Sequence, residues 1–189
     1  MMRKYLQYIT LFSVVFFRYC ATGEEFVRSD VNFQKYQRIA VFPLTDYYSS
    51  PGSGIQVADI VSFEMLKRGL KIVDRANTET ILREQKIGIS GIVDEKTAPN
   101  VGKLLGVQAI LTGSINEYTT TEVDVAFKGP PSYLTISAVG LTLKLIDTET
   151  GEVVWSATGR ATQVGDRMYS ICAQNAVKKM LVQLSNHLK

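Results

Sequence analysis

The sequence predicts an α/β domain: a mixed β-sheet flanked by helices, ending in an antiparallel hairpin and a C-terminal helix. Three observations support this fold class. Residues 39–44 and 109–114 are short apolar runs, which are typical of strands buried on both faces of a sheet. Amphipathic helices alternate with strands before residue 109, whereas consecutive strands follow it. The segment after Asp166 repeats apolar side chains at the spacing of a helix that packs on a core.

The first half of the chain is predicted to alternate strands and helices. The strand at 39–44 ends near Pro43, which has no amide hydrogen for a sheet ladder. A helix is expected over 55–68, because its apolar residues recur every three to four positions. A second strand at 70–74 and a short helix at 79–85 follow.

The stretch 101–114 is the centre of the predicted domain. It combines the last turns of a helix, a stop at Gly106 and the buried strand 109–114. Glycine at a helix C-terminus adopts the left-handed conformation at little cost. Gly113 inside the strand leaves room for a neighbouring element to approach closely. These residues are therefore interpreted as a packing unit.

The second half is predicted to consist of strands and one long helix. Strands are expected over 109–117, 122–127, 133–146 and 152–162. A slip in the alternation near Gly140 predicts a β-bulge there, and residues 147–151 predict a hairpin turn. Asp166 is expected to cap the final helix, in which Cys172 is a small buried member of the apolar stripe.

The loop 45–54 holds the predicted partner-contact residues. Tyr47 and Tyr48 are adjacent, and exposed tyrosines often anchor a protein partner. The glycines at 52 and 54 suggest a phosphate-binding turn, but the Lys-Ser/Thr ending of a P-loop and the third glycine of a dinucleotide fingerprint are both missing. The loop is therefore interpreted as a flexible connection rather than a phosphate site.

No residue pattern in the chain indicates catalysis. Asp46, Asp74 and Asp147 lie at strand ends, where α/β enzymes often place carboxylates, but turn and cap chemistry accounts for them. The single histidine, His187, lies two residues from the end of the chain and does not favour a histidine-based acid–base site. No cysteine or histidine spacing fits zinc. We therefore expect no catalytic residue, cofactor or metal site.

Composition and charge argue against nucleic acid as a partner. The 189 residues are 46% hydrophobic and 21% charged, which is ordinary for a globular domain. The formal charge of +3 comes from Arg3, Lys4 and Arg18, because the first twenty residues contain no acidic side chain. Without them the chain has 18 basic and 18 acidic residues. A nucleic-acid-binding domain normally has a basic excess.

The N-terminal segment is predicted to be a secretion signal. A basic start precedes the mostly apolar run 6–17, which would span about 18 Å as a helix, short of the roughly 30 Å of a membrane core. Cys20 stands where a bacterial lipoprotein carries its acylated cysteine, whereas Ala21 and Gly23 offer an ordinary cleavage site before Glu24. Both processing routes remain open. We expect the chain to have three parts: a signal peptide with possible lipid attachment at 1–23, a tether at 24–37, and the domain at 38–189.

Four segments appear in an order that resembles a known family. They are Arg-Ile-Ala-Val-Phe-Pro at 38–43, Leu-Lys-Ile-Val-Asp-Arg at 70–75, the glycine-punctuated block at 102–114, and Leu-x-Leu-Ile-Asp-Thr-Glu-Thr-Gly-Glu-Val-Val-Trp at 143–155. From about Arg38 to its end, the chain resembles the curli assembly protein CsgG and its wider family of envelope lipoproteins. The resemblance implies a periplasmic domain like the N-terminal domain of TolB. The family includes outer-membrane secretion channels, lipoprotein activators of peptidoglycan synthases and flagellum-associated lipoproteins.

The sequence departs from the channel branch of that family. Those channels insert two β-hairpins per subunit into a shared barrel, and each membrane strand needs about 9–11 residues. Residues 119–137 offer at most one short hairpin, interrupted at 128–131. Only residues 163–165 separate the last strand from the final helix, which leaves no room for a second hairpin. A curli-type pore is therefore not expected.

The leading expectation is a non-enzymatic periplasmic lipoprotein, tethered to the outer membrane through Cys20, that binds other envelope proteins or itself. It would support an envelope assembly or secretion system. The sheet edges, the loop with Tyr47 and Tyr48, and the final helix are the expected contact surfaces. Two alternatives stay open. One is an oligomeric CsgG-type secretion component with 123–134 as a reduced pore hairpin, and the other is a nucleotide-binding or hydrolytic domain using Asp46 and the glycine loop.

Overall fold

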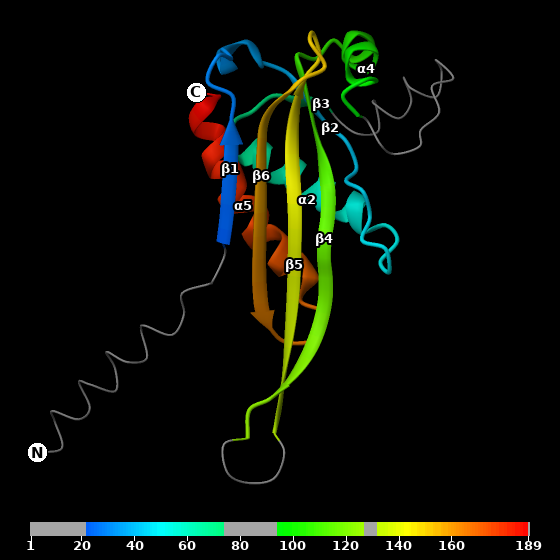
Figure 1. The fold of residues 1–189 in the computed structure, drawn as a ribbon, viewed down its shortest axis with the longest axis vertical. Helices are drawn as coiled ribbons and strands as arrows, with labels where there is room; N and C mark the ends of the chain where they lie inside the picture. Colours follow the sequence, from blue (N-terminus) through cyan, green and yellow to red (C-terminus); the bar gives the residue numbers. More distant parts are fainter. Residues whose placement is uncertain (1–21, 74–93, 127–131, 189) are drawn as a thin grey trace, which may run out of the picture.

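The computed structural model describes residues 22–73, 94–126 and 132–188, which form a sheet with helices packed on it (Figure 1). The elements of these ranges are β1 (Thr22–Val27), the 3-10 turn η1 (Phe33–Lys35), β2 (Ile39–Val41), α2 (Ser53–Lys67), β3 (Ile72–Val73), α4 (Ala98–Leu105), β4 (Ala109–Asp124), β5 (Tyr133–Asp147), β6 (Val153–Val164) and α5 (Tyr169–His187). The expected helix 79–85, Asp74, Cys20 and the turn 128–131 lie outside the described residues.

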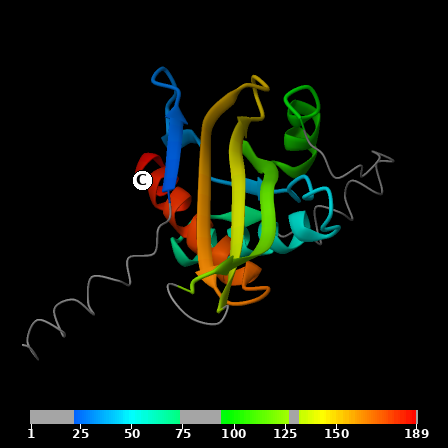
Figure 2. The ribbon, with the colours of Figure 1, turned by 60° about the horizontal axis from the view of Figure 1, so that its bottom comes forward.

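The described strands form one six-stranded sheet in the order β1-β6-β5-β4-β2-β3 (Figure 2). Strand β2 runs parallel to both β3 and β4, whereas β4, β5, β6 and β1 pair antiparallel. The sheet is therefore mixed, and the antiparallel hairpin and the final helix follow its parallel part. This confirms the predicted fold class.

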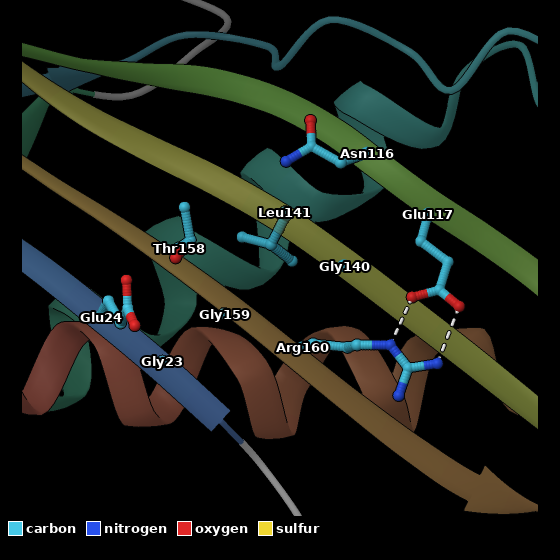
Figure 3. Close-up of a pocket in the computed structure, with 9 residues that line it drawn as sticks. All are labelled: Gly23, Glu24, Asn116, Glu117, Gly140, Leu141, Thr158, Gly159 and Arg160. Atoms are coloured by element: carbon cyan, nitrogen blue, oxygen red, sulfur yellow. Dashed lines mark hydrogen bonds and ion pairs between the residues drawn. The ribbon is translucent and has the colours of Figure 1, made fainter.

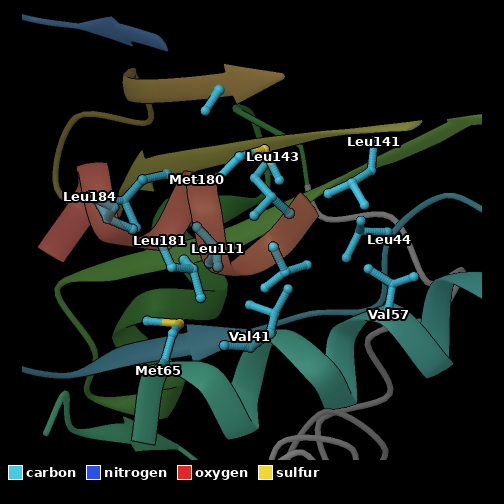
Figure 4. Packing of buried hydrophobic residues seen from close by; sticks show 14 of the residues in the cluster. Val41, Leu44, Val57, Met65, Leu111, Leu141, Leu143, Met180, Leu181 and Leu184 are labelled. Atoms are coloured by element: carbon cyan, nitrogen blue, oxygen red, sulfur yellow. The ribbon is translucent and has the colours of Figure 1, made fainter. Parts of the chain in front are cut away.

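The core is divided between the two faces of the sheet. Helices α2 and α5 cover one face, where Leu111, Leu143 and Met180 are fully buried (Figure 4). Helix α4 packs on the other face at one end of the sheet, against Ile110 and Ile146. Successive side chains of a strand point to opposite faces, which is why residues 110 and 111 belong to different clusters. The rest of the second face carries no helix among the described residues, and we call it the open face.

Several local predictions are confirmed. Gly106 ends α4 in the left-handed conformation with φ of 60°, and its amide donates to the carbonyl of Gly102. Helix α2 packs through the expected stripe, and Cys172 is fully buried in α5. The Cys172 thiol donates to the carbonyl of Ser137 at 3.4 Å, as expected of a small core residue.

The expected tether over 24–37 is wrong, because this segment belongs to the domain. Strand β1 pairs with β6 from Thr22–Arg160 to Val27–Trp155. In the η1 turn that follows, Phe33 and the next residue after the turn, Tyr36, are buried in the core. The segment looks polar because an edge strand has one exposed side and few fully buried positions.

The expected bulge at Gly140 is on the opposite strand. The register shifts between Ile115 and Glu117, so that Asn116 is the extra residue, and Glu117 faces Gly140. A side chain at Gly140 would lie 3.2 Å from the Glu117 Cβ. The glycine therefore marks the place where the facing strand is bulged. Strand β4 also continues without a break to Asp124, where two separate strands were expected.

Asp166 does not cap the final helix, which corrects another prediction. Helix α5 begins at Tyr169, with Met168 as the residue before it and no side-chain cap. The Ser137 hydroxyl accepts a hydrogen bond from the Met168 amide at 3.0 Å. The preceding turn uses the left-handed region at Arg167, with φ of 51°. The start of the helix is thus fixed by a hydrogen bond to a side chain of strand β5.

Candidate interaction surface

Among the described residues, one side of β4 has no paired strand over much of its length. Strand β2 pairs with β4 over 109–111, and the last backbone hydrogen bond on that side among the described residues is the amide of Ile115 donating to the Thr45 carbonyl at 3.0 Å. Beyond Ile115, no described strand pairs with this side of β4. An edge of this kind presents unpaired backbone donors and acceptors to another chain. We call residues 116–124 the β4 edge.

The direction of the backbone groups on the β4 edge follows from its neighbours. The Gly165 amide donates to the Thr135 carbonyl, so the backbone of Thr135 points away from β4. Its partner across the ladder is Glu122, whose amide and carbonyl must therefore point outward. By the same alternation, Tyr118 and Thr120 also present their backbone groups to the outside.

The hairpin of β4 and β5 continues past the end of β6, and we call residues 121–126 and 132–136, which begin at the last pair with β6, the arm (Figure 1). Its side toward the open face is apolar: Val123 lies opposite Leu134, and Val164 lies opposite Ile136. Val123 is 41% exposed and Val164 is 54% exposed. The other side of the arm carries the carboxylates of residues 122 and 124. The arm is therefore amphipathic.

The loop after β2 places Tyr47 and Tyr48 beside the first part of the β4 edge. Their rings are 4.5 Å apart, with Tyr47 packed partly against the core and Tyr48 86% exposed. The hydrogen bond between the two tyrosines, with burial and the negative charges nearby, raises the pKa of Tyr47. The exposed ring of Tyr48 has the position that a partner-contact residue requires. Its binding role remains a prediction.

Asp46 explains what the glycine loop does. Its carboxylate accepts hydrogen bonds from the amides of Gly52 at 2.8 Å and Gly54 at 2.6 Å, and from the Ser53 hydroxyl at 3.5 Å. These bonds, chiefly that from Gly52, hold the pKa of Asp46 below its usual value. A bound phosphate would need the same amides at the start of α2. The chain's own carboxylate already uses them, which leaves the nucleotide hypothesis without its donors.

The open face contains a shallow depression of about 560 Å³ between β1, β6, β5 and β4 (Figure 3). Within its lining, the Arg160 guanidinium donates two hydrogen bonds to the Glu117 carboxylate, at 2.6 and 2.9 Å. This pairing lowers the pKa of Glu117. The Asn116 amide donates to the Thr142 hydroxyl at 2.8 Å. The charged pair and the Asn116 amide in this lining thus already have hydrogen-bond partners in the chain.

Asp147 and His187, two further residues considered in the sequence analysis, both contact the N-terminal segment. Asp147 is buried and bonded to Lys35 and Tyr36, where it joins the N-terminal segment to the β5–β6 turn. His187 packs beside the Phe33 ring and lies 3.8 Å from the Glu25 carboxylate.

Within the described ranges, no group of three His, Cys, Asp or Glu side chains is placed to hold a metal ion. None of the described helices is long and apolar enough to cross a membrane.

The β4 edge was only partly visible in the sequence. Sheet edges were expected as contact surfaces, but which strand would be exposed depends on the strand order. The signal that could have found it is the run of three threonines at 119–121 between an apolar strand and an alternating one. Such a run is typical of a strand that is half solvated.

Several solved structures of bacterial proteins have a similar fold. The PelC dodecamer from Paraburkholderia phytofirmans aligns with a TM-score of 0.53 and 22% identity, over 87% of this chain and 97% of that chain. A lipoprotein from Neisseria meningitidis aligns with a TM-score of 0.58 and 15% identity, over 79% and 98%. The C-terminal domain of LpoB from Escherichia coli has a TM-score of 0.51 and 13% identity, over 69% and 85%. At these identities the likeness concerns the fold.

No curated protein matches the chain closely. The sequence model of the curli production assembly/transport component CsgG, in contrast, matches residues 30–168. The matched range includes β2, the loop with Tyr47 and Tyr48, the whole β4 edge and the arm. It also begins within the segment that was expected to be a tether. The chain belongs to the CsgG family.

Proposed function

We propose that the protein is a periplasmic lipoprotein, held at the outer membrane through Cys20, that supports an envelope assembly or secretion system by binding another envelope protein. The observation that carries the proposal is the β4 edge, flanked by the exposed ring of Tyr48 and the apolar side of the arm. Membership in a family described by assembly and transport supports it. The occupied amides of the glycine loop favour binding over nucleotide chemistry.

A photoreactive residue in place of Tyr48 is expected to form one dominant adduct with a foreign envelope protein in living cells. Tyr48 is almost fully exposed, so this replacement should leave the stability within about 0.5 kcal/mol of the wild type. The adduct is identified by mass spectrometry. The matched control places the same photoreactive residue at Lys103, which is exposed on α4, on the face of the sheet opposite to α2 and α5. Equal adducts at both positions would contradict the proposal.

A second candidate function is an oligomeric secretion component, and the amphipathic arm favours it. Strand alternation with one apolar and one polar side suits a hairpin that faces lipid on one side and water on the other. The PelC structure with a similar fold is a dodecamer. On this candidate, self-adducts at Tyr48 would replace the foreign one.

The secretion candidate predicts that purified oligomers conduct ions across liposome membranes. Val123→Arg should abolish that conductance, because a charge on the lipid side of a membrane strand costs about 2–4 kcal/mol. Glu117→Gln serves as a control, since Glu117 lies outside the arm. Oligomeric preparations that give no conductance would eliminate this candidate.

A further inference from the structure

We infer that the β4 edge binds its partner by strand addition, and that the partner contributes an extended, basic segment. The inference rests on the protein-binding function proposed above. It adds the part of the surface that binds and the chemistry of what is bound. Three properties of the edge lead to it: its outward backbone groups, its charge and its apolar margin.

The backbone of the β4 edge is prepared for another strand. Tyr118, Thr120 and Glu122 direct both an N–H and a C=O away from β5, at the spacing of an antiparallel or parallel ladder. A folded domain offers these groups to water, and an extended peptide can replace the water with main-chain hydrogen bonds. The edge is nine residues long and β-branched at its centre, which suits an extended partner.

The charge of the edge selects the partner. Residues 116–124 contain three carboxylates and no Lys or Arg. Arg160 pairs with Glu117, but no ion pair joins Glu122 or Asp124 to a described residue. A second copy that docked edge to edge would bring the same negative charges and be repelled, whereas a basic segment is attracted to this edge. The charge therefore favours a basic segment over the β4 edge of a second copy.

The side chains define a pattern for the bound segment. Glu122 and Asp124 point to the side of the sheet that α5 covers, while Val123 points to the open face beside Leu134. A strand added to this edge would place alternate residues next to each group. The fitting segment therefore alternates basic residues toward the carboxylates with apolar residues toward Val123.

The test uses the purified full-length protein and a fluorescein-labelled ten-residue peptide of alternating lysine and valine. A second peptide has the same side chains but N-methyl groups on alternate amides, which removes backbone donors. We expect saturable binding of the first peptide and at least about tenfold weaker binding of the second, measured by fluorescence anisotropy. No saturable binding by the wild type up to about 1 mM peptide would overturn the inference.

Glu122→Pro separates strand addition from simple charge attraction. Proline is tolerated on an edge strand where its missing N–H would face outward, so the fold and the melting temperature should change little. Glu122→Gln removes only the charge. We expect Glu122→Pro to weaken peptide binding at least about tenfold, and Glu122→Gln to weaken it less and to reduce its salt dependence. Wild-type binding by a folded Glu122→Pro protein would refute strand addition.

The remaining outcomes distinguish this inference from the proposed function. If ultracentrifugation shows a dimer that Glu122→Pro dissociates, the occupant of the edge is a second copy and the basic partner is wrong. If a foreign adduct at Tyr48 persists in Glu122→Pro cells at the wild-type level, the protein binds its partner elsewhere. The proposed function would then stand while strand addition at the β4 edge would fall.

Discussion

Gly54→Ala is expected to lower the free energy of unfolding by about 3 kcal/mol, although alanine is the better helix former. Gly54 is buried at the second position of α2, where its carbonyl accepts a hydrogen bond from the Leu44 amide at 3.3 Å. A Cβ there would overlap the carbonyl oxygen of Leu44 and lie 2.7 Å from the carbonyl carbon. Backbone atoms cannot turn aside as a flexible side chain can. The start of helix α2 must therefore move away from Leu44, in the loop after β2.

Gly69→Ala is the matched comparison for this steric effect. Gly69 has φ of 78°, and a Cβ there would meet no atom within 4 Å. Its replacement should cost only the left-handed backbone strain, about 1–2 kcal/mol. Urea unfolding of the two variants measures the difference. If Gly54→Ala costs no more than Gly69→Ala, the close approach of α2 to the backbone of Leu44 is not what requires glycine. Gly54→Ala should also weaken the adduct at Tyr48, because Asp46 bonds the amide of Gly54 and so positions the loop.

Much of this fold could be predicted from local periodicity. Helix α2, helix α5 and the strands at 39–44 and 133–146 have apolar spacing that their burial explains. Gly106 was predictable because a left-handed helix end requires a residue without a Cβ penalty. These features depend on neighbours in the sequence, so the sequence alone identifies them.

The errors concern contacts between distant residues. Strand β1 exists because β6 pairs with it, and Glu25 also accepts a hydrogen bond from the Trp155 indole at 3.1 Å. Neither contact leaves a periodic pattern at 22–27. The bulge was seen as a slip near Gly140, but periodicity in one strand cannot tell which of two paired strands has the extra residue.

The candidate surface also has a part that local sequence predicts and a part that depends on distant contacts. Tyr47 and Tyr48 were predicted because paired aromatics in a loop stand out in any sequence. The β4 edge is free only because β2 is short and β6 lies on the other side of β5, which is a property of topology. Asp46 was correctly assigned to turn chemistry, but its bonds to two amides at the start of α2 required the structure.

Asp147→Ala is expected to destabilise the protein by about 3 kcal/mol at neutral pH, the lower end of the range for breaking a buried charge pair. The carboxylate is 3% exposed and accepts hydrogen bonds from the Tyr36 hydroxyl at 2.8 Å and the Glu149 amide at 2.7 Å. The Lys35 ammonium lies 2.5 Å away. Removing the carboxylate leaves the buried Tyr36 hydroxyl without its acceptor. Lys35 is 39% exposed and can turn to water, which limits the loss.

The loss should depend on pH in one direction. Burial alone would raise the pKa of Asp147, but Lys35, Tyr36 and two backbone amides outweigh burial and lower it. A lowered pKa in the folded state means that the ionised carboxylate stabilises the fold at any pH above its unfolded value of about 3.9. This stabilisation is lost as the pH falls through the lower, folded pKa. The stability difference between wild type and Asp147→Asn should therefore be constant from pH 7 to about 5 and shrink below about 4.

Asp166→Ala provides the control for this last prediction. Asp166 is exposed, forms an ion pair with its neighbour Arg167, and caps no helix. Its removal should change the stability by less than about 0.5 kcal/mol at any pH. Urea unfolding of the three variants from pH 7 to 3 makes the comparison. A difference for Asp147→Asn that persists below pH 3 would mean that packing, rather than the charge of Asp147, joins the N-terminal segment to the β5–β6 turn.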